Sequence, residues 1–291
     1  MNNSKSLGID IGGTNIKAVR VDASGKVQKR LDTPTPSDRD VLVATVRDLV
    51  KQLEGHKGPI GVASPGLAAS DNRSIRWMRG RLEAVEGLAW PEALGQPAVV
   101  LNDVHAATMG EAWVGAATGL QHVVMLTLGT GVGGGAICNG QLLQGAFGRA
   151  GHLGHITLDL DGPVDIVKTP GSLEDWVGNH NVQARTGFES TAKLVAAVAQ
   201  GNAQAAKHWD RTLHALTCGI VSLINVFDPQ AIVLGGGIAK AGEEALFKPL
   251  REKLDRYEWR PLDQPVPILP AEMGDLAGAV GAARFAMMQL F

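Results

Sequence analysis

Short apolar segments that end in glycine-rich turns characterise the first third of the chain. Segments 6–11, 16–21 and 27–32 predict three antiparallel strands, with a turn at residues 23–25. Apolar residues at spacings of three and four between Val41 and Leu53 predict a helix, and Ser37 could cap it. Two short apolar segments, 60–63 and 98–102, predict buried strands, and 104–115 predicts a helix after the second of them.

The remainder of the chain begins with similar strands and then becomes helical. Segment 123–128 and the residues after its turn predict two strands, and we expect a further strand at 156–160. Helices are expected at 190–209 and 211–227, and Pro229 ends the second. A strand at 231–234, a helix near 243–254 and a terminal helix at 276–290 complete the prediction.

The first glycine turn carries candidate chemistry. The sequence Leu-Gly-Ile-Asp-Ile-Gly-Gly-Thr-Asn-Ile-Lys over residues 7–17 places Asp10 at a strand end, before Gly12, Gly13 and Thr14. Rossmann and P-loop motifs run from a strand into a helix, whereas this turn joins two strands. Glycines let backbone N–H groups approach an anion, Thr14 adds a hydroxyl donor, and a carboxylate can hold the Mg²⁺ that accompanies phosphates. Taken alone, the segment could equally be an ordinary hairpin.

The same pattern occurs a second time. The segment 123–128 ends in Gly129-Thr130-Gly131 and is followed by a glycine-rich strand, about 120 residues after the first hairpin. An internal duplication at this spacing predicts two similar lobes whose Gly/Thr turns face one cleft.

Together these segments closely resemble the ROK family of sugar kinases and sugar-responsive repressors. The residues that carry the resemblance lie in order along nearly the whole chain, at 10–17, 101–103, 128–135, 151–155, 171–174 and 234–239. The resemblance implies an α/β protein with the two-lobed actin-like ATPase (ribonuclease H-like) fold of actin, hexokinase and the heat-shock ATPases, with duplicated βββαβα halves. We place the N-terminal lobe at residues 1–117, with 276–291 returning to it, and the C-terminal lobe at 118–275.

The bulk composition excludes several functional classes. A net charge of −2 provides no field for nucleic acid or an anionic membrane. Cys138 and Cys218 lie far apart in the sequence, which fits a reducing cytoplasm without a disulfide or a metal pair. We see neither a signal peptide nor a membrane span, so a cytoplasmic protein is expected, and a homodimer is the expected assembly.

The resemblance identifies a catalytic residue and a nucleotide site. Asp103 sits where a strand leads into a helix and would be the general base, although aspartate also favours the N-cap of a helix. The residues that would hold ATP are Asp10, Gly12, Gly13, Thr14, Lys17, Thr130, Gly131, Gly236 and Gly237. Asp10 would bind Mg²⁺ through water, and the glycine turn at 235–237 would lie against the adenosine.

The resemblance also assigns the sugar site and a departure from the family pattern. The sugar would contact Gly66, Asn102, Asp103, His152, His155 and Glu174. Many relatives have glutamate at the position of His152, whereas N-acetylmannosamine kinases share the histidine. Many relatives also place three zinc-binding cysteines between the equivalents of His155 and Glu174. This chain has no cysteine there, so we expect no structural zinc.

The substrate loop at 70–90 departs from the family pattern as well. It carries four arginines, at positions 73, 76, 79 and 81, where many relatives have an Asn-Leu pair. These arginines fit a solvated loop. As a set they would also suit an anionic substrate group or a partner subunit.

The leading hypothesis is an ATP-dependent kinase that phosphorylates a hexose hydroxyl, with the 6-hydroxyl of glucose as the default for the family. The alternatives are a kinase of N-acetylmannosamine or another hexosamine, a polyphosphate-dependent glucokinase, and a non-catalytic sugar-responsive regulator. The family's repressors carry a helix-turn-helix ahead of the first strand. Only Met1–Lys5 stand there in this sequence, so we do not expect DNA binding.

Overall fold

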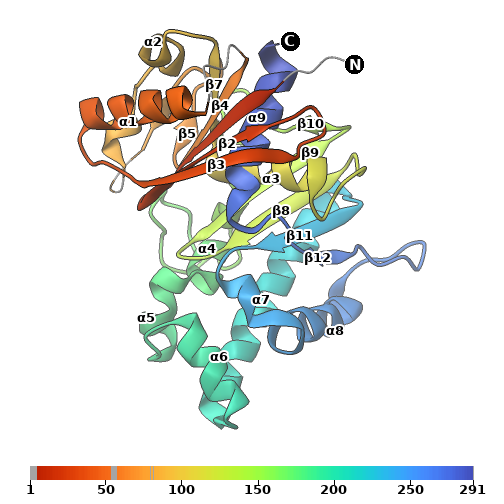
Figure 1. Ribbon diagram of the computed structural model, residues 1–291. Helices are drawn as coiled ribbons and strands as arrows, with labels where there is room; N and C mark the ends of the chain where they lie inside the picture. Colours follow the sequence, from red (N-terminus) through yellow and green to blue (C-terminus); the bar gives the residue numbers. More distant parts are fainter. Residues whose placement is uncertain (1–4, 54–57, 79, 81, 291) are drawn as a thin grey trace. The chain divides into compact units, whose positions relative to one another are not determined.

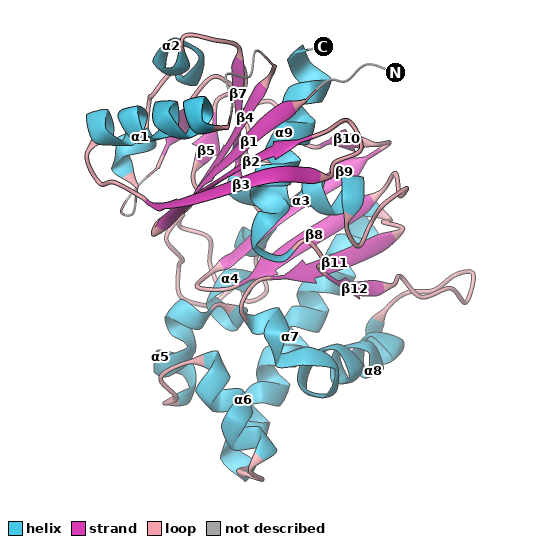
Figure 2. Cartoon of the chain, in the orientation of Figure 1, coloured by secondary structure: helices cyan, strands magenta, loops and turns pink. Residues whose placement is uncertain are grey.

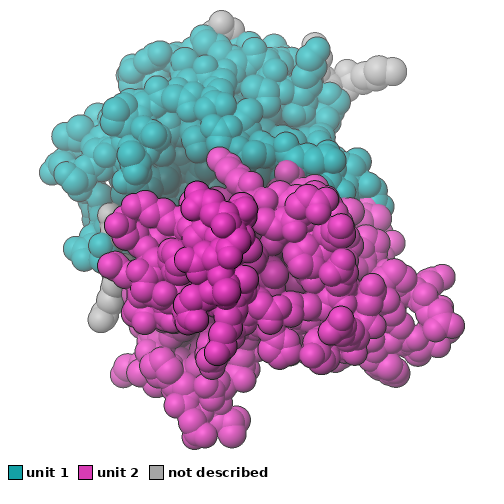
Figure 3. Space-filling view, turned by 90° about the horizontal axis from the view of Figure 1, so that it is seen from below, with its two compact units in different colours: residues 1–119, 142–151, 272–291 teal, residues 120–141, 152–271 magenta. Residues whose placement is uncertain are grey.

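The computed structural model describes residues 5–53, 58–78, 80 and 82–290, and it divides the chain into two compact units. Unit 1 comprises residues 1–119, 142–151 and 272–291, and unit 2 comprises 120–141 and 152–271 (Figure 3). The segment 142–151 therefore belongs with the N-terminal residues, although it follows the second hairpin in the sequence.

Unit 1 is built on a five-stranded sheet of order β3-β2-β1-β4-β7 (Figure 1). Its strands are β1 (Ser6–Ile11), β2 (Asn15–Val21), β3 (Val27–Pro34), β4 (Ile60–Ser64) and β7 (Ala98–Asn102). Its helices are α1 (Arg39–Gln52), α2 (Trp90–Leu94), α3 (Asp103–Val114) and α9 (Ala277–Leu290). A separate two-stranded sheet pairs β5 (Leu67–Ala68) with β6 (Ile75–Trp77), followed by a 3₁₀ turn at Glu83–Val85.

The two faces of this sheet are covered by different helices (Figure 2). Alternate residues of β1 point to opposite faces, so Leu7, Ile9 and Ile11 join the core under α1. The other face receives α9, which approaches so closely that a Cβ on Gly8 would lie 1.7 Å from the carbonyl oxygen of Ala279. Asp10 points to this same face, next to the first turn of α9.

Unit 2 repeats the sheet of unit 1 with the order β10-β9-β8-β11-β12. Its strands are β8 (Val123–Leu128), β9 (Val132–Cys138), β10 (Gln141–Leu142), β11 (Ala231–Gly235) and β12 (Ile268–Pro270). In each sheet the first strand pairs antiparallel with the second and parallel with the fourth in the chain order of that sheet. The duplication inferred from the two Gly/Thr turns is thus confirmed in the strand order.

The helical part of unit 2 is larger than that of unit 1. Its helices are α4 (Leu173–Val177), α5 (Val182–Thr186), α6 (Thr191–Ala199), α7 (Ala203–Phe227) and α8 (Lys248–Tyr257). Single 3₁₀ turns lie at Leu153–His155, Asn179–Asn181 and Ile238–Ala241, another at Gly274–Leu276 in unit 1, and a π turn at Glu243–Phe247 precedes α8. The long helix α7 packs against α4, α6 and α8.

Two predictions from sequence periodicity were wrong. The segment 156–160 is not a strand, because its ladder is limited to a single bridge between Thr157 and Ser172. The break between the predicted helices 190–209 and 211–227 lies instead at residues 200–202, where Gly201 has a φ of +81° and Asn202 caps α7. The apolar pattern runs across this break, so periodicity alone could not locate it.

Across the part of the chain that the structure describes, no helix is long and apolar enough to cross a membrane.

Candidate functional site

The turn between β1 and β2 is closed by its own backbone and braced by the end of β3. The Gly12 N–H donates to the carbonyl oxygen of Asn15 at 3.0 Å. Thr35 holds the turn from outside, since its hydroxyl donates to Gly12 O at 2.7 Å and its N–H donates to Thr14 O at 2.8 Å. Gly13 and Thr14 remain exposed. The turn is therefore fixed in place while its outer surface stays open to a ligand.

Asp10 lies behind this turn among other charged groups. It pairs in register with Lys17 across the β1–β2 ladder, and Lys17 in turn lies 4.0 Å from a carboxylate oxygen of Asp275. Burial, together with the negative charges of Asp103 and Asp275, raises the pKa of Asp10 to about 7, while Lys17 opposes the rise. This surplus of carboxylates over cations would favour a bound metal cation.

Asp103 is the first residue of α3, directly after β7. The alternative interpretation of Asp103 as the helix cap is wrong, because Asn102 occupies that position and its Oδ1 accepts the N–H groups of Val104 and His105. The Asn102 Nδ2 donates to Gly66 O at 3.0 Å, and the Asn102 side chain also hydrogen-bonds Asp103. Asn102 thus ties the predicted base to both the helix start and the Pro-Gly turn.

The environment of Asp103 shifts its acidity in the direction that a general base needs. Burial raises the pKa of Asp103, and the hydrogen bonds from Val104 N–H and the Asn102 side chain oppose that rise.

Gly66 is required by the fold, because its φ is +105° and a Cβ there would lie 2.7 Å from the backbone oxygen of Trp77.

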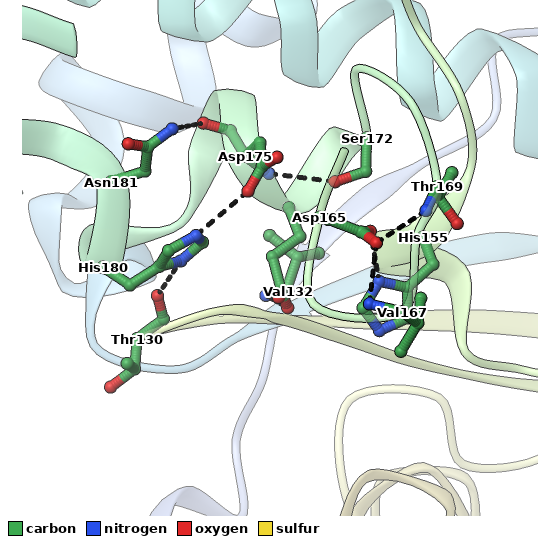
Figure 4. Close-up of polar contacts among 11 residues, drawn as sticks. Thr130, Val132, His155, Asp165, Val167, Thr169, Ser172, Asp175, His180 and Asn181 are labelled. Carbon is green, nitrogen blue, oxygen red and sulfur yellow. Dashed lines mark hydrogen bonds and ion pairs between the residues drawn. The ribbon is translucent and has the colours of Figure 1, made fainter. Parts of the chain in front are cut away.

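In unit 2, the matching turn at Gly129–Gly131 is braced by the segment after α4 (Figure 4). The Asn179 N–H donates to Gly129 O at 2.9 Å, and the His180 N–H donates to Thr130 O at 2.8 Å. The His180 ring adds its Nδ1, 2.9 Å from the same Thr130 oxygen, while its Nε2 lies 3.1 Å from Asp175 Oδ1. Both duplicated turns are therefore held through their carbonyl oxygens, which leaves their outer faces exposed.

Glu174 connects the predicted sugar site to this turn. Its Oε2 accepts the N–H of Val132 at 2.9 Å, at the start of β9. A Cβ on Gly131 would lie 2.2 Å from the same oxygen, so glycine at that position makes room for the carboxylate. The structure thus brings Glu174 and the turn residue Gly131 together, a proximity that the sequence did not predict.

The two predicted histidines stand around a 3₁₀ turn. His155 is the last residue of this turn, and His152 is the residue immediately before the turn begins. The His155 Nδ1 lies 2.8 Å from Oδ2 of Asp165, whose side chain is buried (Figure 4). No hydrogen bond that we identify joins His155 to Glu174.

The third glycine turn follows β11. Gly236 has a φ of +87°, and a Cβ there would lie 2.4 Å from Leu128 O, so the fold itself requires glycine. Gly237 differs, because a Cβ would meet no atom within 4 Å and its φ is −65°. The turn is thereby packed against the end of β8, immediately before Gly129.

Four supporting residues escaped the sequence analysis: Thr35, Asp165, Asp175 and His180. Thr35 lies in a Pro-rich connection, and the other three lie in or near a loop without periodicity. No sequence pattern distinguishes a polar residue that braces the site in such a segment from one that is simply exposed to solvent. The only feature of the sequence that could have pointed to His180 was its short distance along the chain from Glu174.

The arginine loop is described in part. Arg73 forms an ion pair with Glu92, and Arg76 is exposed. Arg79 and Arg81 lie outside the described residues.

The described residues contain no group of three or more His, Cys, Asp or Glu side chains placed to hold a metal ion. The interval between His155 and Glu174 in particular offers one buried carboxylate and no thiol, which does not fit a structural zinc site.

Comparison with known proteins gives a consistent result. The model of the ROK family matches residues 6–289. A glucokinase from Thermotoga maritima is 30% identical over 96% of this chain and 96% of its own length. An N-acetylmannosamine kinase from Escherichia coli O157:H7 is 30% identical over 97% of this chain and 98% of its own.

Solved structures agree with these relatives. The ROK hexokinase from Thermus thermophilus has a TM-score of 0.85 at 29% identity and covers 98% of this chain and 99% of its own. A ROK family glucokinase from Streptomyces griseus, in complex with glucose and AMPPNP, has a TM-score of 0.79 at 27% identity, covering 98% and 100% of the two chains. These structures share the actin-like ATPase fold that the duplicated hairpins predicted.

Proposed function

The chain belongs to the ROK family, and from this premise we propose that it transfers the γ-phosphoryl group of ATP to the 6-hydroxyl of glucose. It is a sugar kinase, an ATP:hexose phosphotransferase, as its glucokinase relatives and the complex of a ROK glucokinase with glucose and AMPPNP support. Phosphoryl transfer needs positioning and charge neutralisation more than covalent chemistry from the protein.

One observation carries the proposal for the phosphate site. A Cβ on Gly13 or on Gly129 would meet no atom within 4 Å, and neither residue has a positive φ. The fold therefore does not require glycine at either position. A ligand that approaches the bare backbone gives glycine a reason in both duplicated turns. The Gly129 N–H itself donates to Gly131 O, so other backbone N–H groups of these turns would bind the phosphate oxygens.

In the proposed reaction, Asp103 accepts the proton of the attacking sugar hydroxyl. Its raised pKa supports this role, because a general base works best when its pKa lies near the operating pH. Asn102 orients the base through its hydrogen bond to Asp103, and we propose that it contacts the sugar as well.

The remaining sugar contacts are proposed for Gly66, His152, His155 and Glu174. Gly66 lies in the turn between β4 and β5, the two histidines lie at the 3₁₀ turn 153–155, and Glu174 lies in α4. Glu174 already accepts the Val132 N–H through one oxygen. A carboxylate has about four acceptor sites, so it can accept a sugar hydroxyl as well.

The negative charge around Asp10 favours a Mg²⁺ ion held through water, since the described residues form no group of direct metal ligands. Asp10 lies near Asp103 and Asp275 with Lys17 as the neighbouring cation, and a divalent ion would relieve their mutual repulsion. We propose that Asp10 holds Mg²⁺ through a water molecule, as Mg²⁺ keeps much of its hydration shell. When bound, the ion neutralises phosphate charge. Thr14, Lys17, Thr130 and Gly131 would then contact the phosphates, and Gly236 and Gly237 the adenosine.

One further observation supports N-acetylmannosamine as an alternative substrate. Relatives named N-acetylmannosamine kinase match this chain over nearly its full length, and His152 is the residue by which the sequence resembles them. Polyphosphate stays an alternative to ATP as the phosphoryl donor.

A coupled assay of ADP release over a panel of hexoses and N-acetylhexosamines tests the proposal. We expect glucose to give the highest kcat/KM with ATP. A preference for N-acetylmannosamine would replace glucose as the substrate. Formation of sugar phosphate from polyphosphate in the absence of ATP would replace the donor. No turnover with any sugar would contradict the proposed function.

We further propose that the protein is cytoplasmic, which its two free cysteines support. We also propose that it is a homodimer, as the family resemblance implies. Light scattering on the purified chain would give the mass of the assembly.

A further inference from the structure

The loop between His155 and Glu174 is organised around one carboxylate. Asp165 is 8% exposed, and its Oδ1 accepts the N–H groups of Val167 at 2.9 Å and Thr169 at 2.8 Å. Its Oδ2 lies 2.8 Å from His155 Nδ1 (Figure 4). The Ser172 hydroxyl hydrogen-bonds Asp165 as well. Asp165 therefore meets four donors from residues on both sides of it in the loop.

These hydrogen bonds keep Asp165 ionised. Burial by itself would raise the pKa of Asp165, but the hydrogen bonds from Thr169, His155, Val167 and Ser172 outweigh burial and leave the pKa below its ordinary value. An ionised carboxylate has only acceptor sites, so the His155 nitrogen that faces it must carry a hydrogen.

The hydrogen on Nδ1 determines the role of Nε2 on the other side of the imidazole ring. In neutral histidine, a hydrogen on Nδ1 leaves Nε2 without one, so Nε2 can only accept a hydrogen bond. The His155 side chain is 22% exposed, against 1% for that of Asp165, so the ring separates the buried carboxylate from the surface.

We propose that Asp165 is a positioning residue that fixes the ring of His155 and its tautomer, so that His155 presents Nε2 as an obligate hydrogen-bond acceptor to the substrate. The sugar group opposite it must then donate a hydrogen, as a hydroxyl or an amide N–H does. The assignment of His155 to the sugar rests on the proposed function, whereas the tautomer does not.

The same carboxylate also connects the histidine to Glu174. The Ser172 side chain caps α4 by accepting the Asp175 N–H at 3.3 Å, while its hydroxyl hydrogen-bonds Asp165. Glu174 lies in the first turn of that helix. One buried group therefore sets the position of two predicted sugar contacts.

The substitution Asp165→Asn gives a sharp test because asparagine has a single acceptor oxygen. Keeping the bonds from the Val167 and Thr169 N–H groups places its NH₂ group against His155 Nδ1. Nδ1 must then accept, and the hydrogen moves to Nε2, which becomes a donor. The shape of the side chain hardly changes while the tautomer reverses, as in the aspartate-to-asparagine change of a serine-protease triad.

The first measurement is the tautomer of His155 in protein labelled with ¹⁵N-histidine, read from long-range ¹H–¹⁵N correlations and assigned by loss of the signal in His155→Gln. We expect Nδ1–H in wild type and Nε2–H in Asp165→Asn. The control is Asp161→Asn, which changes an exposed carboxylate in the same loop and should leave the signal unchanged. An Nε2–H tautomer in the wild-type protein overturns the proposal, even if Asp165→Asn fails to fold.

The second measurement uses deoxy and deoxyfluoro glucose analogues, since fluorine can accept a hydrogen bond but cannot donate one. At the hydroxyl that faces His155, both analogues should lose about ten- to a hundredfold in kcat/KM with wild type. In Asp165→Asn the fluoro analogue should recover relative to the deoxy analogue. If the tautomer is as expected but no position shows this pattern, the proposed contact between His155 and the sugar fails, while the positioning of His155 by Asp165 stands.

Discussion

A carboxylate that takes a proton from a sugar hydroxyl needs a pKa above that of a surface aspartate. At Asp103 the fold provides this through burial, and the hydrogen bonds from Val104 N–H and Asn102 limit the effect. The cost of this arrangement is a charged group held away from water. At the scale of single residues, the proposed role of Asp103 and the stability of the fold therefore oppose each other at this position.

The substitution Asp103→Asn should separate the two effects. We expect kcat to fall by about 10²–10⁴-fold or more while sugar affinity by calorimetry changes little, because the amide keeps the shape and loses the base. A carboxyl group with a raised folded-state pKa binds its proton more tightly when folded. Its contribution to stability is therefore highest below the unfolded-state pKa of about 3.9 and is lost as the pH rises through the folded-state pKa. Asp103→Asn should therefore melt at or above the wild-type temperature at neutral pH.

The pH dependence follows from the same shift. The base must be ionised, so kcat should fall on the acid side through a pKa higher than the ordinary value of about 3.9 for aspartate. The exposed residue Asp40 provides the control substitution Asp40→Asn, which should keep the wild-type profile. An Asp103→Asn enzyme within tenfold of wild type would remove Asp103 from the role of base.

Two glycines of the proposed nucleotide site should respond in opposite ways to alanine. Gly13→Ala should melt like wild type but raise the KM for ATP, because the added Cβ meets no protein atom within 4 Å. Gly236→Ala should lower the melting temperature, because its φ is +87° and its Cβ would lie 2.4 Å from Leu128 O. An unchanged KM for ATP in Gly13→Ala would show that no ligand approaches this turn.

Among the elements, α9 depends most on small side chains. A Cβ on Gly281 would lie 1.7 Å from Ala106 O of α3, and one on Gly61 of β4 would lie 1.8 Å from Ala282 O. Helix α9 therefore packs between the sheet and α3 at backbone contact distance, next to Asp10.

The substitution Gly281→Ala should accordingly destabilise the protein. Overpacking of this kind costs about 1–3 kcal/mol, and more where the contact is with backbone. Chemical denaturation would measure it, with the exposed substitution Gln289→Ala on the same helix as the control, for which we expect a change within about 0.5 kcal/mol. Equal stability of the two variants would mean that α9 can move away from α3 at little cost.

The elements also show what could be predicted from the sequence. Asp10 lies near the end of an apolar strand, and Asp103 and the two Gly/Thr turns follow apolar strands. Strand order and turn position could be inferred from that local pattern. The bonds of Asp165 and His180 could not, because each depends on where a loop without periodicity folds back. The segment 156–160 was misread for the same reason, since the N–H groups of Leu158 and Asp159 both donate to Gly171 O and only a single bridge forms, at Thr157.

For the whole molecule, the residues with proposed roles occur in both units. Asp10, Asn102 and Asp103 belong to unit 1, and Thr130, His155 and Glu174 belong to unit 2. The proposed roles fall on residues of each unit, so we expect neither unit to be active by itself.

The whole protein should also be independent of zinc. Structural zinc needs about four nitrogen or sulfur ligands, and the interval from His155 to Glu174 contains no cysteine. We expect no stoichiometric zinc by elemental analysis and an unchanged melting temperature after treatment with a chelator. One equivalent of zinc, or a loss of stability after its removal, would contradict this prediction.

The identity of the phosphorylated product tests the central claim most directly. Wild-type protein incubated with ATP, Mg²⁺ and glucose should form glucose 6-phosphate and ADP in equal amounts, as followed by ³¹P NMR, while 6-deoxyglucose should yield no sugar phosphate and Asp103→Asn should form product orders of magnitude more slowly. Phosphorylation of 6-deoxyglucose, or an equal rate with Asp103→Asn, would contradict the account.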